Sequence, residues 1–333
     1  MPQTNIRYHY SEKSCQDAAR AFRRIVFWGL TGGVNGTHTH RHVFRAYFDT
    51  CRAFDIETAW LSDQTQDPDL SPDDLVFVHG LSANLDQVLK SGAAIVDFHN
   101  WILKDLGDPN YEALLTYERR LSEADGRLPK KTKAEKWDLL TLYDPERRIL
   151  SQPWGSDLLG RDFKEPALNT ETRKVFWIGN WWHSDAEDWG NLKEIAALRD
   201  ALAKHGLQLV LFNNCDRAQN ALFVRESRLG PSIAGAGQVK ENHLACRFFK
   251  NISYGQFALS NVPMAEKFLE SNLVYSPDIH DLIDKAMALS PKEAKEMVLF
   301  QQEKIKPFTI AAHLYLLFLA VHTFCPRGGT HDI

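Results

Sequence analysis

The feature that most constrains this fold is a repeated alternation of short apolar segments with amphipathic helices. Residues 25–28 (IVFW) have the composition of a buried strand. After a Gly-rich turn, Phe44, Tyr47 and Cys51 recur at steps of three and four, which places them on one face of a helix. Because parallel neighbours in a sheet need a crossover connection, this alternation predicts parallel βαβ units.

The alternation continues along the first half of the chain and restarts in the second. Further strands are predicted at 56–61, 75–78, 93–98, 174–178, 207–212 and 273–275. Helices are predicted at 84–90, 192–205, 241–255, 279–289 and, in one or two pieces interrupted near Pro307, 291–324. Residues 109–148 are charged and are predicted to be helical. A chain of 333 residues suits two domains of about 150 residues each, so we expect two βαβ assemblies.

The composition excludes some classes of function. A net charge of −4 gives no basic face of the kind that nucleic acid binding needs. The five cysteines are scattered without a CxxC pair, which indicates reduced thiols in a cytoplasmic protein and no metal site. The apolar residues 310–324 and the basic residues 130–136 leave peripheral membrane attachment open, beside the simpler interpretation of a buried helix and a solvated loop.

The turn after the first predicted strand is a candidate ligand loop. Gly32 and Gly33 lie there, where backbone N–H groups approach a ligand and a helix N-terminus favours an anion; an ordinary βα turn is the alternative. The GxGxxG spacing of a dinucleotide site is absent. His38 and His40 follow at the head of the helix as candidate donors or bases, with metal ligation and solvated histidines as alternatives.

A candidate general base lies at the end of the strand predicted at 93–98. Asp97 and His99 are two residues apart, so strand alternation places both side chains on one side, where the carboxylate would orient the imidazole. The carboxyl ends of parallel strands line the crevice in which ligands bind. A structural hydrogen-bond cluster at the strand end is the alternative.

Two further candidate sets lie in the second half. Gly179 and Asn180 end the strand 174–178, where another ligand loop is expected. Arg247 and Lys250 lie three apart, on neighbouring positions of a helix. Their charge-assisted hydrogen bonds suit a phosphate, whereas a solvated basic face is the alternative.

Together these segments resemble the GT-B glycosyltransferases, in which two Rossmann-like domains face each other across a cleft. The resemblance rests on the Gly32-Gly33 turn and on residues 152–157 (QPWGSD), 175–179 (VFWIG) and 247–255 (RFFKNISYG). It implies an α/β fold with an N-terminal, acceptor-side domain at 1–150 and a C-terminal, nucleotide-sugar domain at 151–305. It also implies that a helix within 306–333 packs back on the N-terminal domain.

The resemblance also assigns the donor site. It implies that the nucleoside diphosphate lies against the C-terminal domain, near Lys250 and the helix end that follows it. The residues so assigned are Arg247, Lys250, Asn251, Ser253, Tyr254, Ser260 and Asn261. The two glutamates, eight positions apart, of many retaining members have no counterpart here, so the stereochemical outcome stays open.

The implied activity is transfer of a sugar from a nucleoside-diphosphate sugar to a glycan or another hydroxyl acceptor, lipid-linked ones included, as in polysaccharide biosynthesis. No metal and no cofactor beyond the donor are expected, because basic residues and helix N-termini would stabilise the leaving diphosphate. Two alternatives stay open: a nucleotide-sugar epimerase on the same scaffold, and a non-catalytic two-lobed protein that binds a small ligand.

Overall fold

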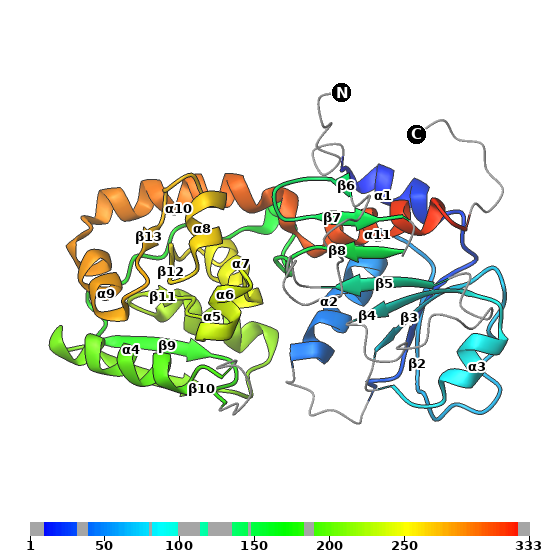
Figure 1. The fold of residues 1–333 in the computed structure, drawn as a ribbon, viewed down its shortest axis with the longest axis horizontal. Helices are drawn as coiled ribbons and strands as arrows, with labels where there is room; N and C mark the ends of the chain where they lie inside the picture. Colours follow the sequence, from blue (N-terminus) through cyan, green and yellow to red (C-terminus); the bar gives the residue numbers. More distant parts are fainter. Residues whose placement is uncertain are drawn as a thin grey trace. The chain divides into compact units, whose positions relative to one another are not determined.

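The computed structural model describes residues 10–31, 39–79, 82–98, 114–118, 135–145, 148–182 and 190–325. The chain forms two compact units, drawn in Figure 1. Unit 1 contains the described residues up to Gln152 together with those from Ile310 onward, and unit 2 contains Pro153–Thr309.

Unit 1 is built on an eight-stranded sheet with the order β2-β1-β3-β4-β5-β8-β7-β6. Its strands are β1 (Ile25–Trp28), β2 (Thr58–Leu61), β3 (Leu75–His79), β4 (Ala94–Phe98), β5 (Leu114–Glu118), β6 (Glu135–Lys136), β7 (Leu142–Asp144) and β8 (Ile149–Ser151). Neighbouring strands from β2 to β8 in this order pair in parallel. At the other end of the sheet, β8 pairs with β7 and β7 pairs with β6, both in antiparallel. The parallel part is therefore a sheet of the βαβ kind.

Helices cover both faces of this sheet. α2 (Thr39–Ala53) packs an aromatic cluster on one face, where Phe44 lies edge-on to Phe27 and Phe98 with ring centroids 5.7 and 5.2 Å apart. α3 (Leu85–Lys90) covers the other face through Val88. α1 (Glu12–Ala19) and α11 (Ile310–His322) pack against each other on the α2 side. α11 is apolar around nearly its whole circumference, as expected of a helix buried on all sides.

Unit 2 carries two small parallel sheets, one of two strands and one of three. β9 (Lys174–Ile178) pairs with β10 (Gln208–Phe212), and β12 (Ala258–Ser260) pairs with β11 (Gly230–Pro231) and β13 (Val274–Tyr275), every pair in parallel. The Arg228 N–H donates to the Lys174 carbonyl at 2.8 Å, which joins the β9 side to the β11 side.

Helices pack around the two sheets of unit 2 and are seen in Figure 1. They are α4 (Leu192–Lys204), α5 (Arg217–Glu226), α6 (Ala236–Lys240), α7 (Cys246–Ser253), α8 (Pro263–Phe268), α9 (Ile279–Ala288) and α10 (Pro291–Ile305), with the short 3-10 turns η3 (Gly160–Asp162) and η4 (Lys306–Phe308). The core gathers apolar residues of β9, β12, α4 and α9, among them Trp177, Leu198 and Leu282, all fully buried. The predicted class, an α/β protein with parallel sheets, is confirmed.

The prediction of helix over residues 109–148 is wrong for the described part of that range. It holds β5, β6 and β7 instead. β5 is held between β4 and β8, so pairing with distant strands overrides the local composition. The helix predicted from residue 241 begins at Cys246, after a turn in which Asn242 has a φ of 53°.

Neither a membrane span nor a metal cluster occurs in the described part of the chain. No helix there has the length and apolar character needed to cross a bilayer. No group of three or more His, Cys, Asp or Glu side chains there has the geometry of a metal site.

Candidate functional site

The candidate site of unit 2 lies where β9 and β10 end. Gly179 follows β9 directly, and its N–H donates to the Phe212 carbonyl at 2.8 Å. The φ of Gly179 is +137°, a value that side-chain-bearing residues rarely adopt. α7 brings Arg247 and Lys250 to this edge from a separate part of the chain. The carboxyl edge of a parallel sheet is where ligands of α/β proteins bind.

Two groups at this edge hold Arg247 in place, and Gly179 leaves room for its guanidinium. Its guanidinium carbon lies 3.6 Å from the centroid of the Trp177 ring, in cation–π geometry. Its Nε donates to the Ile178 carbonyl at 3.1 Å. A Cβ added to Gly179 would lie 2.5 Å from Nη2 of Arg247, so the close approach of the guanidinium to the backbone requires glycine.

The charge of Arg247 has no carboxylate partner among the described residues. Burial lowers the pKa of its guanidinium to about 10, because a low-dielectric surrounding disfavours the charged form. By surface area Arg247 is half-buried, and a charge partly removed from water is stabilised by an anion. A phosphate or a carboxylate of a ligand would supply the partner that this arrangement lacks among the described residues.

Lys250 lies one helical turn after Arg247 and is buried, with 9% of its surface exposed. Burial and then the Asp216 carboxylate raise the pKa of the Cys215 thiol, and the charge of Lys250 partly offsets that rise. The ammonium of Lys250 thus lies within electrostatic reach of the segment that follows β10. No ion pair of Lys250 is present among the described residues.

The remaining candidates on α7 and β12 use their side chains within the protein. The Asn251 amide donates to the Pro231 carbonyl at 3.5 Å, and the Ser253 hydroxyl donates to the Lys250 carbonyl at 3.0 Å. The Ser260 hydroxyl donates to Ser232 O at 3.1 Å. The Asn261 amide makes two bonds to the backbone of Ala234, at 2.8 and 2.9 Å. These side chains fix the strand-to-loop connections around α7.

Tyr254 belongs to a buried cluster that the sequence did not indicate. Its hydroxyl contacts both carboxylate oxygens of Asp157, at 2.9 and 2.8 Å, and Arg217 Nε lies 3.1 Å from Oδ2 of the same carboxylate. Burial, and then Asp157, raise the pKa of the Tyr254 hydroxyl well above its ordinary value. The cluster ties the first residues of unit 2 to α5 and α7.

The loop after β9 is closed at its base by Asn191. The side-chain oxygen of Asn191 accepts from the Trp182 N–H at 3.1 Å, and its amide donates to the Asn180 carbonyl at 3.3 Å. Trp182 is 41% exposed. Asn180 therefore contributes its carbonyl to the loop closure, and its exposed side chain lies beside Gly179.

In unit 1 the structure describes Asp97, one of the two residues of the predicted general-base pair. Asp97 is fully buried in β4 and is in register with Val78, whose face packs against α3. The predicted residues Gly32, Gly33, His38 and His99 lie outside the described residues, and His40 is described only as part of the α2 backbone.

Comparison with known proteins yields similarity of structure but not of sequence. No protein-family model matches the chain, and no curated protein matches it. The N-terminal domain of a trehalose-6-phosphate phosphatase from Candida albicans is similar, with a TM-score of 0.51, 10% identity, and coverage of 91% of this chain and 97% of that one.

A UDP-forming α,α-trehalose-phosphate synthase from Burkholderia xenovorans matches with a TM-score of 0.47 and 9% identity, over 90% of this chain and 98% of that one. A structure of such a synthase from the same organism, in complex with glucose-6-phosphate, matches with a TM-score of 0.49 and 11% identity, over 87% and 83% of the two chains. The Candida albicans domain shares its fold with this chain over nearly the whole chain length. That fold is an α/β fold of the GT-B kind.

Proposed function

We propose that the protein is a glycosyltransferase that moves a sugar from a nucleoside-diphosphate sugar to a hydroxyl acceptor. The observation that carries the proposal is the pair of basic residues, Arg247 and Lys250, at the carboxyl edge of the β9–β10 sheet, with no carboxylate partner among the described residues. The shared fold with a domain named for a trehalose-6-phosphate enzyme supports a sugar phosphate as the first acceptor class to test.

In this proposal the two cations act on the leaving group. As the bond between the sugar and the diphosphate breaks, negative charge grows on the diphosphate, and preorganised positive groups stabilise that charge without reorganising. Arg247 is preorganised because Trp177 and the Ile178 carbonyl fix its guanidinium. Two protein cations would supply the charge that other enzymes take from a divalent metal, so transfer is expected to persist in a chelator.

The acceptor side of the proposal uses the residues predicted from the sequence. His99 oriented by Asp97, or His38 or His40, would take the proton of the acceptor hydroxyl if the reaction inverts the anomeric carbon. The acceptor, which includes glycans and lipid-linked sugars, and any peripheral membrane contact remain predictions. The assignment of the donor to unit 2 and of the acceptor to unit 1 is also a prediction.

The test is thermal unfolding against UDP, GDP, ADP, dTDP and CMP, with NAD as a control. A ligand at about 100 times its Kd adds roughly 2.7 kcal/mol of stability, which raises Tm by a few degrees. One diphosphate should stabilise the protein selectively, and the matching nucleotide-sugar should then release it when an acceptor is present. Stabilisation without release on any acceptor would favour the binding protein, and a product altered without an acceptor would favour the epimerase.

Lys250→Met tests whether Lys250 itself binds the diphosphate, rather than acting through the overall charge of the protein. It keeps the length of the side chain and removes a charge-assisted hydrogen bond of about 1.5–3 kcal/mol, which corresponds to a diphosphate Kd roughly ten- to 150-fold higher. Lys292→Met on α10 is the matched control, because the Lys292 side chain is exposed and, among the described residues, pairs with Glu296 alone, at 3.9 Å. Equal affinities in the two variants would remove Lys250 from the site.

A further inference from the structure

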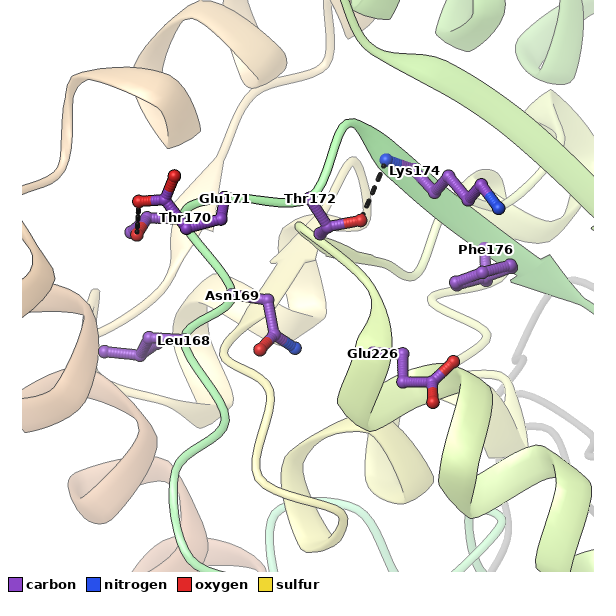
Figure 2. Close-up of a pocket in the computed structure, with 8 residues that line it drawn as sticks. All are labelled: Leu168, Asn169, Thr170, Glu171, Thr172, Lys174, Phe176 and Glu226. Atoms are coloured by element: carbon purple, nitrogen blue, oxygen red, sulfur yellow. Dashed lines mark hydrogen bonds between the residues drawn. The ribbon is translucent and has the colours of Figure 1, made fainter.

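Unit 2 contains a pocket at the amino end of β9, away from the basic pair of Arg247 and Lys250. It has a volume of about 490 Å³ and is lined by the segment Leu168–Thr172, by the start of β9 and by Glu226 at the end of α5. Figure 2 shows these side chains around the opening. A strand rises about 3.3 Å per residue, so Lys174 in this pocket and Gly179 at the basic pair lie roughly 16 Å apart along β9.

The wall of the pocket is preformed. The Lys164 N–H donates to the Ser253 carbonyl and the Ala167 N–H donates to the Gly255 carbonyl, both at 2.8 Å. The Asn169 amide donates to the Arg225 carbonyl. Because these bonds fix the segment to α5 and to the end of α7, little ordering is left for a ligand to bring about.

One side of the pocket is an aromatic ring held by two others. The Phe176 ring stacks on Phe223 with centroids 5.3 Å apart and an interplanar angle of 27°, and on Phe212 at 5.9 Å and 29°. Phe176 is only half-buried. It leaves apolar ring surface for the C–H groups of a ligand.

The polar groups around this ring offer both donors and acceptors. Glu171, Lys174 and Glu226 are exposed and form no ion pair with any described residue. The Thr172 hydroxyl oxygen accepts from the Lys174 N–H at 3.3 Å, which leaves the hydroxyl hydrogen available to a ligand. The Asn169 side chain retains its carbonyl oxygen as an acceptor.

These groups select one class of ligand. An anion would meet two carboxylates against one ammonium, and an apolar ligand would desolvate three charges without compensation. A neutral polyhydroxy compound would donate to Glu171 or Glu226 and accept from Lys174, and its C–H face would pack on Phe176, all of which line the pocket. We propose that this pocket is a binding site for a neutral sugar, as a monosaccharide unit or a short oligosaccharide, separate from the basic pair. The proposal does not rest on the proposed function, since the lining alone carries it.

The test measures binding of maltotriose and cellotriose, two neutral probes, by saturation-transfer NMR and calorimetry on the full chain. Glucosamine and glucuronic acid represent the cationic and anionic classes. The variants are Glu226→Arg, which fills the opening and reverses a charge, and Phe176→Leu, which removes the ring. Asp200→Arg is the matched control, because Asp200 is an exposed carboxylate on α4 outside the pocket.

We expect the wild-type protein and Asp200→Arg to bind at least one neutral trisaccharide with the same affinity. Glu226→Arg and Phe176→Leu should each weaken that affinity at least tenfold, while their affinity for the nucleoside diphosphate stays at the wild-type value. Three results would overturn the proposal: no neutral sugar binds at millimolar concentration, the affinity survives Glu226→Arg, or glucosamine binds more tightly than the neutral probes. Loss of diphosphate binding by Lys250→Met reports on the other site, so the two proposals fail separately.

Discussion

Replacing Gly179 by alanine tests whether Arg247 binds its ligand through the close approach of its guanidinium to the backbone. The added methyl group would lie 2.5 Å from Nη2 and 3.6 Å from the guanidinium carbon, and the first of these distances is too short for any real contact. Since the backbone at position 179 ends β9 and is fixed by the Phe212 carbonyl, the arginine side chain should move. It would then leave the Trp177 ring.

The structure sets the size of two separate effects. A φ of +137° is nearly restricted to glycine, so alanine strains the backbone by about 1–3 kcal/mol and lowers the free energy of unfolding by that amount. Displacement of Arg247 removes a charge-assisted hydrogen bond to the diphosphate of about 1.5–3 kcal/mol. The expected rise in Kd is roughly ten- to 150-fold.

The assay is calorimetric titration with the diphosphate that stabilises the wild-type protein, beside urea unfolding of each variant. Gly206→Ala is the control for backbone strain, because Gly206 has a φ of +68° and no atom within 4 Å of the added Cβ. It should lose stability and keep the wild-type Kd.

A double-mutant cycle with Arg247→Gln decides the cause. If alanine acts by displacing the arginine, the Gly179→Ala change should raise Kd little further once Arg247 is gone, so the two effects should not add. Full additivity, or a wild-type Kd in Gly179→Ala, would refute the argument that Gly179 positions Arg247.

Two further predictions concern stability. Tyr254→Phe removes the hydroxyl that contacts both oxygens of the buried Asp157, so urea unfolding should show a loss of about 1.5–3 kcal/mol; unchanged stability would show that the Tyr254 hydroxyl does not stabilise the buried carboxylate. For Asp74, burial raises the pKa, but hydrogen bonds from Arg23 and the Ser71 N–H and the charge of Arg24 lower it overall. The ionised Asp74 carboxylate therefore stabilises the folded state above the unfolded pKa of about 3.9. This stabilisation is lost as pH falls through the pKa that Asp74 has in the folded state. Asp74→Asn should lower the urea midpoint at neutral pH, and that difference should shrink in acid; a pH-independent difference would contradict the linkage.

The strands that could be predicted from sequence are those whose own residues define them. β1 and β9 were expected at their observed bounds, because an apolar run bounded by turns needs no other information to be identified as a strand. β5 was missed, since it becomes a strand only by pairing with β4 and β8, and no local period distinguishes its segment from the charged residues around it.

The same distinction applies to the candidate site. Arg247 and Lys250 were found from their spacing, but the role of Trp177 was not, because its ring and the guanidinium are 70 residues apart in the chain. The glycine that follows an apolar strand was the local signal for Gly179, and only the tertiary structure gives that glycine its neighbour. The contact between Tyr254 and Asp157 spans 97 positions and has no local signal at all.

Arg247 and Lys250 differ from the other residues predicted around α7 in how far the protein itself satisfies their polar side chains. Asn251, Ser253 and Asn261 direct their side chains to backbone groups of the same unit, as stable folds require of buried polar atoms. The guanidinium of Arg247 is instead kept at a lowered pKa of about 10 by burial, against an aromatic ring and one carbonyl. A fold selected for stability alone gains little by holding two cations at one edge without a carboxylate, since each loses hydration there. Local departures from such rules are expected where a ligand completes the arrangement, and we propose that an anion completes this one.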